Sequence, residues 1–211
     1  MRPEGACDRA VPPSGRRIFT IGHSNHPLEI FVDLLKKHRI DVVVDVRSQP
    51  HSRYTPHFDA PELKSALPKE GIKYLFMGKE IGGRPEGREF YDQDGRVLYD
   101  RLAESPVFMD GISRLERRIA QDRVALMCGE EDPTGCHRRL LIGRVLVDRG
   151  IDVCHIRGDG RLQTGAELAE EEERKTRDPA QLPLFDMPEE KAWRSTRSVS
   201  LRERRPPSSE H

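Results

Sequence analysis

Two cysteines with charged residues between them mark the segment 128–138 as the part of the chain richest in reactive groups. Cys128 and Cys136 enclose three carboxylates, and a histidine and an arginine follow directly. The segment lies between two apolar runs, 124–127 and 140–147, which predict a strand before it and a helix after it. Thiols, carboxylates and an imidazole at such a turn can act as nucleophile, acid and base. We therefore expect this turn to carry the chemistry of the protein.

Cys136 is the candidate nucleophile of this turn. It stands at the predicted start of a helix, where unpaired amide hydrogens favour an anion and lower the pKa of a thiol. Arg138 adds positive charge beside it. The alternative is an inert cysteine that caps the helix, and Cys128, at the end of an apolar strand, is expected to be buried. A tyrosine-phosphatase loop is disfavoured, because Thr134 stands where that loop needs an arginine.

The same turn offers metal ligands, but their spacing does not favour a metal site. Cys128, Cys136, His137 and His23 are ligand types suited to zinc, whose structural sites usually pair ligands about two to four residues apart. Neighbouring side chains on a helix diverge by about 100°, so Cys136 and His137 are not expected to share one ion. We predict no metal and no other cofactor, with zinc as the alternative. A disulfide between Cys128 and Cys136 is also within reach.

Carboxylates and a histidine at the predicted strand ends supply candidates for acid–base chemistry. Glu130 and Glu131 follow one strand and His23 follows another, and we expect His23 and Glu130 to act as acid and base. Asp45 lies inside an apolar strand, where a carboxylate needs a partner. Arg47, two residues later, points to the same side of that strand. The alternatives are a structural ion pair in which Asp45 orients Arg47, and a helix-capping role for His23.

Arginines near these strand ends indicate the charge of the ligand. Arg47, Arg53, Arg84 and Arg138 lie in predicted loops or at a helix start, and the glycine pair 82–83 allows close approach of the backbone. Arginines beside a helix N-terminus are typical of phosphate sites, so we expect a nucleotide or nucleic acid as ligand. The chain has no glycine-rich dinucleotide motif and no P-loop, so neither NAD nor ATP is specifically indicated. The other candidate binding residues are Ser24, Asn25, Asp45, Cys128, Glu131 and His137.

Apolar runs and helical patterns alternate along the chain and place these residues at one edge of a sheet. Short apolar runs predict strands at 18–22, 42–46, 72–76, 124–128 and 152–156. Helical spacing predicts helices at 27–38, 61–67, 106–120 and 137–149. The alternation predicts a three-layer α/β fold, with a mostly parallel, five-stranded Rossmann-like sheet and helices on both faces. The carboxyl ends of parallel strands share one edge, and ligands bind there.

A set of short motifs covers residues 17–157. They are Thr20–Ser24, Asp45–Arg47 with Pro50, Ser52 and Arg53, Gly71–Tyr74, Gly82–Arg84, Cys128–Glu130, Cys136–Arg138 and His155–Ile156. In combination these motifs resemble the family called domain of unknown function 488 (DUF488). The resemblance implies an α/β domain and makes these positions the expected site, but it carries no catalytic mechanism.

Length and composition set limits on the rest of the chain. The 211 residues suit one medium domain, expected at 16–170, with tails at 1–15 and 171–211 whose composition predicts disorder. Lysine and arginine number 36 and aspartate and glutamate also number 36, so the net charge indicates no particular partner. The chain shows neither an apolar run that could span a membrane nor the features of a signal peptide. A cytoplasmic protein without a membrane partner is therefore expected.

A peptide in the C-terminal tail, Gln181-Leu-Pro-Leu-Phe185, closely resembles the motif by which bacterial repair and replication proteins bind the DNA polymerase sliding clamp. In that motif the glutamine occupies a small pocket, and leucine and phenylalanine side chains fill an apolar one. Leu182, Leu184 and Phe185 are the apolar candidates here. The alternative is that the peptide folds back and packs on the domain.

These features predict an enzyme that acts on a phosphate-bearing substrate, a nucleotide or nucleic acid, in DNA repair or maintenance, with recruitment to the sliding clamp. The reaction class is not indicated by the sequence. The alternative is a non-catalytic recognition module that binds a modified nucleotide, base or nucleic acid, in which the thiols are structural.

Overall fold

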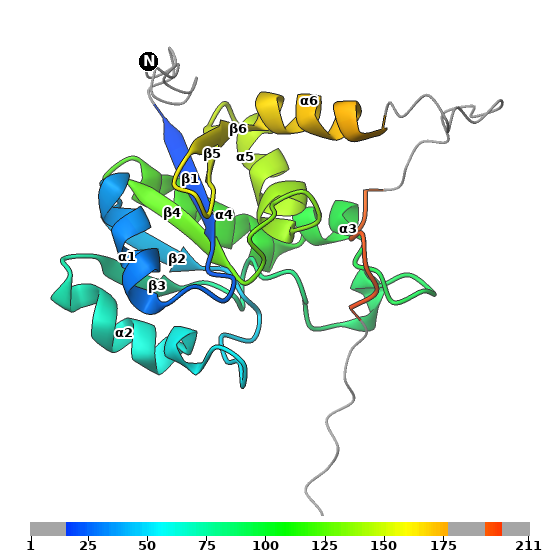
Figure 1. The fold of residues 1–211 in the computed structure, drawn as a ribbon. Helices are drawn as coiled ribbons and strands as arrows, with labels where there is room; N and C mark the ends of the chain where they lie inside the picture. Colours follow the sequence, from blue (N-terminus) through cyan, green and yellow to red (C-terminus); the bar gives the residue numbers. More distant parts are fainter. Residues whose placement is uncertain (1–15, 177–192, 200–211) are drawn as a thin grey trace, which may run out of the picture.

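A sheet flanked by helices forms the centre of the protein (Figure 1). The computed structural model describes residues 16–176 and 193–199, and within them the sheet has six strands in the order β3-β2-β4-β1-β5-β6. The strands are β1 (Arg17–Gly22), β2 (Val42–Asp45), β3 (Lys73–Phe76), β4 (Val124–Cys128), β5 (Asp152–Ile156) and β6 (Leu162–Thr164). The first five strands pair in parallel. The predicted α/β fold with a mostly parallel sheet is therefore confirmed.

The sixth strand was not predicted from the sequence. β6 pairs antiparallel to β5, and the amide of Arg157 donates to the carbonyl of Arg161 (3.0 Å) to close the hairpin. Gly160 makes the turn with a φ of +77°, which favours glycine. Three residues are too few to show the alternation of apolar and polar positions by which strands are recognised.

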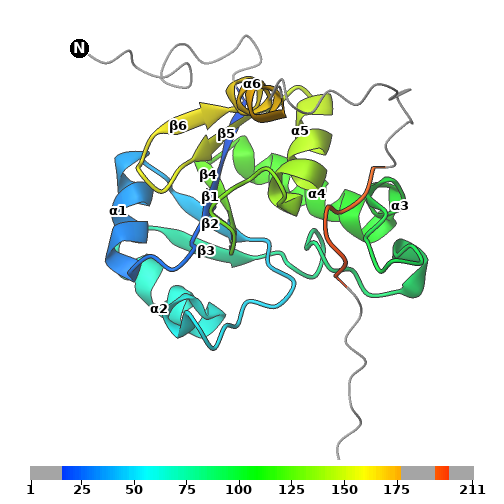
Figure 2. The ribbon, with the colours of Figure 1, turned by 45° about the vertical axis from the view of Figure 1, so that its right-hand side comes forward.

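Helices cover both faces of the sheet (Figure 2). One face carries α1 (Leu28–Lys37) and α2 (Ala60–Lys69), and the other carries α3 (Tyr99–Glu104), α4 (Pro106–Ile119) and α5 (Arg144–Asp148). Each face of the sheet has its own hydrophobic core, and alternate residues of β2 point into one or the other. Val43 packs with α1 and α2, whereas Val42 and Val44 pack with α4. Among the described helices, none is both long enough and apolar enough to cross a bilayer.

The helix predicted at 137–149 is broken into two parts. It begins as a π-helical segment, η4 (Arg138–Gly143), and continues as α5. Short 3-10 turns also occur at η2 (Pro56–Phe58) and η3 (Arg88–Phe90). α3 was not predicted, because six residues are too few to show a helical repeat.

The chain connectivity opens a crevice at the carboxyl end of β4. This strand lies between β2 and β1, and Cys128 is the register partner of Gly22 at its end. The chain leaves β1 and β2 towards helices on one face, but it leaves β4 towards η4 and α5 on the other. Such a change of direction between neighbouring strands leaves room for a ligand above the strand ends.

Two parts of the tail that was expected to be disordered, 171–176 and 193–199, are instead ordered on the domain. α6 (Gly165–Thr176) extends the domain beyond residue 170. Residues 193–199, here called the strap, lie beside α3, as the short red-orange segment of Figure 1 shows. Ser195 and Val199 donate backbone hydrogen bonds to Val97 (2.9 Å) and Gly95 (2.8 Å). The amino-acid composition of the tail, on which the prediction of disorder rested, does not reveal such backbone bonds between distant segments. The candidate clamp-binding peptide, 181–185, lies outside the described residues.

A buried arginine holds the loop that follows β4. Arg138 is 1% exposed and donates to the backbone carbonyls of Glu130 and Glu131 and to the hydroxyl of Thr20 (3.2 Å). The hydroxyl of Thr20 in turn lies 2.8 Å from Nδ1 of His155, which is also buried. Burial, with the nearby charge of Arg138, lowers the pKa of His155 to about 3. A neutral His155 therefore accepts from Thr20, which accepts from Arg138.

A substitution at Gly22 tests how closely the loop after β4 lies against the end of β1. A Cβ atom at this position would stand 1.8 Å from the carbonyl oxygen of Glu130, so the loop would have to move. We expect Gly22→Ala to lower the free energy of unfolding by about 2–3 kcal/mol, measured by urea denaturation. Gly165→Ala is the control, because nothing lies within 4 Å of its added Cβ, and its effect should stay within about 0.5 kcal/mol. Equal stability of the two variants would contradict the close contact.

The lowered pKa of His155 predicts a loss of stability in acid. The folded imidazole stays neutral down to a pH of about 3, whereas the unfolded one takes up a proton near 6.5. The stabilisation is therefore complete above pH 6.5 and is lost as the pH falls towards 3. Between pH 7.5 and pH 5 we expect the free energy of unfolding to drop by about 2 kcal/mol on account of this group. His155→Gln should remove that part of the pH dependence. An NMR titration in which the native His155 ring protonates near pH 6.5 would contradict this account.

Candidate functional site

A cavity of about 440 Å³ lies above the carboxyl ends of β2 and β4. Four segments form its walls: the loops after β2, β3 and β4, and the strap. Its lining comprises Arg47, Ser48, Gln49, His51, Gly83, Arg84, Tyr99, Cys128, Gly129, Glu130, Gly135, Cys136, His137 and Ser195–Val199. Six residues predicted for the site thus meet in one cavity: Arg47, Arg84, Cys128, Glu130, Cys136 and His137.

Two thiols and one imidazole converge in the lining of this cavity. Nδ1 of His137 lies 3.9 Å from Sγ of Cys128 and 3.8 Å from Sγ of Cys136, and the three atoms all lie within 4.8 Å of one another. Nε2 of His137 donates to the carbonyl of Val46 (3.0 Å). This bond places the ring proton on Nε2, so the lone pair of Nδ1 faces the two sulfurs. Both cysteines are free thiols rather than a disulfide.

The expected divergence of Cys136 and His137 is therefore wrong. The divergence applies to neighbours on a helix, but η4 begins only at Arg138, and His137 is its N-cap. The chain turns at Thr134 and Gly135, where the amide of Cys136 donates to the carbonyl of Pro133 (3.1 Å). In this turn the two side chains point to the same place.

The ionisation of the two thiols also differs from the expectation for a helix N-terminus. The neighbouring Cys136 lowers the pKa of Cys128, with help from the charge of Arg138. The neighbouring Cys128, followed by burial, raises the pKa of Cys136. The carbonyl of Cys136, not its thiol, accepts the amides of Arg139 and Leu140 (both 3.0 Å). Cys128 is therefore the more acidic thiol of the pair.

Glycines let the neighbouring loop approach the imidazole closely. A Cβ atom on Gly83 would stand 2.7 Å from the ring of His137, and one on Gly78 would stand 2.0 Å from the carbonyl oxygen of Arg47. The loop after β3 therefore lies directly against the ring of His137. This is the close backbone approach expected from the glycine pair 82–83.

The predicted ion pair between Asp45 and Arg47 is confirmed. Asp45 is fully buried and accepts from Nη2 of Arg47 (2.6 Å), from its Nε (2.9 Å) and from the hydroxyl of Tyr74 (2.8 Å). Arg47 also donates to the carbonyl of Phe58 (2.7 Å). Burial, followed by the charge of Asp45, raises the pKa of Tyr74, so its hydroxyl remains a donor. The pair holds the guanidinium of Arg47 in one orientation at the cavity wall.

His23 lies behind Arg47 and does not line the cavity. Its Nδ1 donates to the carbonyl of Ser24 (2.7 Å), its Nε2 accepts from Arg47 (3.1 Å), and its ring stacks on Phe58 with centroids 4.4 Å apart. Burial and the charge of Arg47 lower its pKa to about 4, so the imidazole is neutral at pH 7. The geometry makes His23 a support for Arg47. Ser24 and Asn25, which follow it, also lie away from the cavity lining.

The remaining charged candidates divide between the cavity and the scaffold. Arg84 is exposed on the cavity wall and pairs with no carboxylate in the described residues, whereas Arg53 lies outside the lining and stacks on Tyr54. Arg138 is buried and holds the loop after β4. Glu131 forms an ion pair with Arg157 through two contacts of 2.9 Å.

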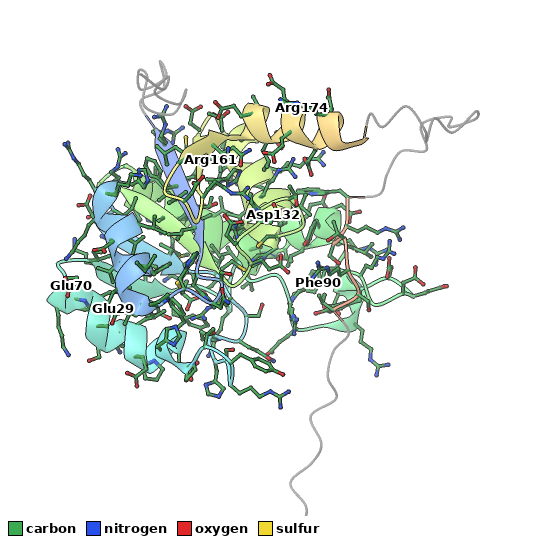
Figure 3. The ribbon with its side chains drawn as sticks, viewed as in Figure 1. Glu29, Glu70, Phe90, Asp132, Arg161 and Arg174 are labelled. Carbon is green, nitrogen blue, oxygen red and sulfur yellow. The ribbon has the colours of Figure 1, made fainter. Side chains whose placement is uncertain are left out.

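A second hollow beside the cavity is lined by carboxylates that pair with arginines. It has a volume of about 580 Å³, and its carboxylates are Glu130, Glu131, Asp132 and Glu172. Asp132, labelled in Figure 3, lies in the loop after β4, with the strap and α6 also contributing to this hollow.

Several cavity residues were not predicted from the sequence. Tyr99 and the strap residues 195–199 come from parts of the chain with no strand or helix pattern near the expected site. Ser48, Gln49 and His51 follow directly on Arg47, so their position after a predicted strand was the available signal. The strap could be recognised only through its long-range backbone bonds to the segment 95–99.

Comparison with known proteins identifies a family but no activity. Residues 27–146 match the family described as "Domain of unknown function DUF488". No curated protein and no solved structure matches the chain. The matched range contains every cavity residue except those of the strap. The chain is a member of the DUF488 family.

Proposed function

We propose that this protein is an enzyme that acts on a phosphate-bearing substrate, a nucleotide or a nucleic acid, in the cavity above β2 and β4. One observation carries the proposal: arginines line the same cavity as a pair of thiols, an imidazole and a carboxylate. Arginine N–H groups are the preferred donors to phosphate oxygens. The volume of about 440 Å³ suits a ligand of nucleotide size.

Three arginines have distinct roles in this proposal. Arg84 is exposed and unpaired by any carboxylate in the described part of the chain, so it is the first donor to a phosphate. Arg47 is oriented by Asp45 and presents a fixed edge to the cavity. Arg197, from the strap, lies 3.7 Å from Glu130, and a phosphate would compete with that carboxylate. Arg53 and Arg138, which the sequence also suggested for phosphate, have no part in it.

The reactive groups are the thiol pair and Glu130. Glu130 is half-exposed on the cavity wall, so it can exchange protons with a bound substrate or a water molecule. Cys128 and Cys136 form the reactive centre next to it. His23 acts as a positioning residue for Arg47, because both of its ring nitrogens are engaged.

A non-catalytic recognition module is the second candidate. The observation that favours it is that His23, Glu131 and Arg138 are all held in internal hydrogen bonds. Such a saturated network suits a rigid binding site as well as a catalytic one. Glu130→Gln separates the two candidates: an enzyme loses turnover and keeps its ligand, whereas for a module turnover is never detected with any variant.

The part of the proposal that concerns DNA maintenance rests on the tail peptide 181–185. A sliding clamp would hold the protein on DNA, where nucleotides and nucleic acid strands are the available substrates. This role places the protein in the cytoplasm. The basic residues that follow the peptide would add weak contacts to DNA phosphates.

Replacement of Arg84 tests the proposed anion site. We expect Arg84→Ala to weaken the binding of a nucleoside diphosphate, measured by calorimetry, at least about tenfold, because a charge-assisted hydrogen bond is lost. A short single-stranded DNA oligonucleotide is the second probe. Arg53→Ala is the matched control, an exposed arginine outside the cavity, and it should bind like the wild type. Equal losses in both variants would indicate non-specific charge attraction and contradict the site.

Replacement of the tail peptide tests recruitment. We expect the chain to bind a bacterial sliding clamp with micromolar affinity, about 7–8 kcal/mol. The triple variant Gln181→Ala, Leu184→Ala, Phe185→Ala should abolish binding and leave the melting temperature unchanged. If the triple variant instead melts at a lower temperature, the peptide belongs to the folded domain and recruitment through it is ruled out.

A further inference from the structure

Cys128, Cys136 and His137 form a set of three side chains that together could hold one ion. Their ligand atoms lie within 4.8 Å of one another, and the sulfur-to-nitrogen distances are 3.9 and 3.8 Å. In a tetrahedral zinc site, Zn–S bonds of about 2.3 Å and Zn–N bonds of about 2.0–2.1 Å place sulfur and nitrogen about 3.6 Å apart. The two sulfur–nitrogen edges of this triangle are therefore only about 0.2–0.3 Å longer than such a site requires.

The imidazole is prepared for a metal by its second contact. Nε2 of His137 donates to the carbonyl of Val46 (3.0 Å), which leaves Nδ1 as the ligand atom. Histidines that bind metals almost always donate their other nitrogen to a carbonyl, a carboxylate or water in this way. The backbone at Gly83 lies against the same ring, with no room for a Cβ atom. The ring is thus held from two sides with Nδ1 directed at the sulfurs.

The surrounding structure keeps the two cysteines together without a disulfide. They are separated by seven residues, and Arg138 fastens the intervening loop through the carbonyls of Glu130 and Glu131. Both thiols are buried. Two thiolates and one divalent cation carry no net charge, so the loaded site would avoid the cost of burying an isolated ion.

We propose that Cys128, Cys136 and His137 bind a zinc ion, with the fourth coordination position open to the cavity. Thiolate and imidazole ligands in a tetrahedral arrangement favour zinc over magnesium or calcium, which take oxygen ligands. Binding releases the protons of the two thiols. All three ligands line the cavity, so a water molecule or a substrate oxygen can occupy the fourth position. Three protein ligands with one open position are the pattern of catalytic zinc sites.

A zinc site would make the two thiols of the proposed reactive centre metal ligands. A zinc ion at this position polarises a phosphoryl oxygen or activates a water molecule. Glu130 on the same wall would take the proton of that water. This catalytic role rests on the proposed function, whereas metal binding itself does not.

Cobalt binding to the full-length, untagged chain tests the proposal. After removal of metals with a chelator, and under reducing conditions, one equivalent of Co²⁺ should produce a sulfur-to-cobalt charge-transfer band and the strong visible absorption of a tetrahedral site. Zn²⁺ should displace the cobalt, and Mg²⁺ should not. If the wild-type protein gives only the weak spectrum of hydrated Co²⁺, the proposal is overturned.

Ligand variants locate the site. Cys128→Ser, Cys136→Ser and His137→Gln should each weaken zinc binding at least about 100-fold in competition with a chromophoric chelator. His51→Gln is the matched control, an exposed histidine on the same cavity that is not one of the three ligands, and it should bind zinc like the wild type. Unchanged zinc affinity in the Cys128→Ser and Cys136→Ser variants would reject the site.

Two measurements separate this proposal from the proposed function. Should a ligand variant fail to fold, the wild-type cobalt spectrum still decides whether a thiolate site exists. The calorimetric effect of Arg84→Ala, measured on metal-free protein, decides whether the cavity binds phosphate. A negative cobalt result would leave the phosphate site unaffected, and a negative calorimetric result would leave the metal site unaffected.

Discussion

The buried guanidinium of Arg138 is the interaction on which the site depends. It is 1% exposed, and its partners in the described residues are the hydroxyl of Thr20 and the carbonyls of Glu130 and Glu131. A buried cation is costly unless its N–H groups are satisfied, so the loop after β4 cannot open without exposing or orphaning those donors. This requirement turns the loop back on itself and brings Cys136 to the side of Cys128. The convergence of thiols and imidazole is thus a consequence of where one arginine is buried.

The position of β4 between β2 and β1 decides which other groups join that loop. Because parallel strands end on the same edge, Arg47 from the end of β2 meets Cys128 from the end of β4 in one cavity. The glycines at 78 and 83 allow the loop after β3 to close over this edge. The strap then completes the wall from the opposite end of the chain. The site is therefore assembled from segments that are separated by more than 100 residues.

Internal pairing leaves few charged groups available at the cavity. Asp45 neutralises Arg47, Arg157 neutralises Glu131, and His23 is kept neutral by burial. These pairs fix the geometry of the site, since breaking one would leave a buried charge without a partner. The groups that remain available at the cavity include the exposed Arg84 and Arg197, the half-exposed Glu130 and the cluster of two sulfurs and an imidazole. Only the groups that are not held in internal pairs can contact a ligand or take part in a reaction in the cavity.

The sequence by itself determined the α/β fold, the five parallel strands and the edge at which the site lies, because apolar periodicity and the shared direction of parallel strands are local properties of the chain. It also identified the Asp45–Arg47 pair, since two residues apart on a strand face the same side. Only the tertiary structure decided that Arg138 braces a loop instead of facing a ligand, and that Cys136 and His137 converge. Both depend on a turn whose shape is set by hydrogen bonds to distant residues. The strap, likewise, is held by backbone bonds between segments about 100 residues apart, and backbone groups carry no sequence signature.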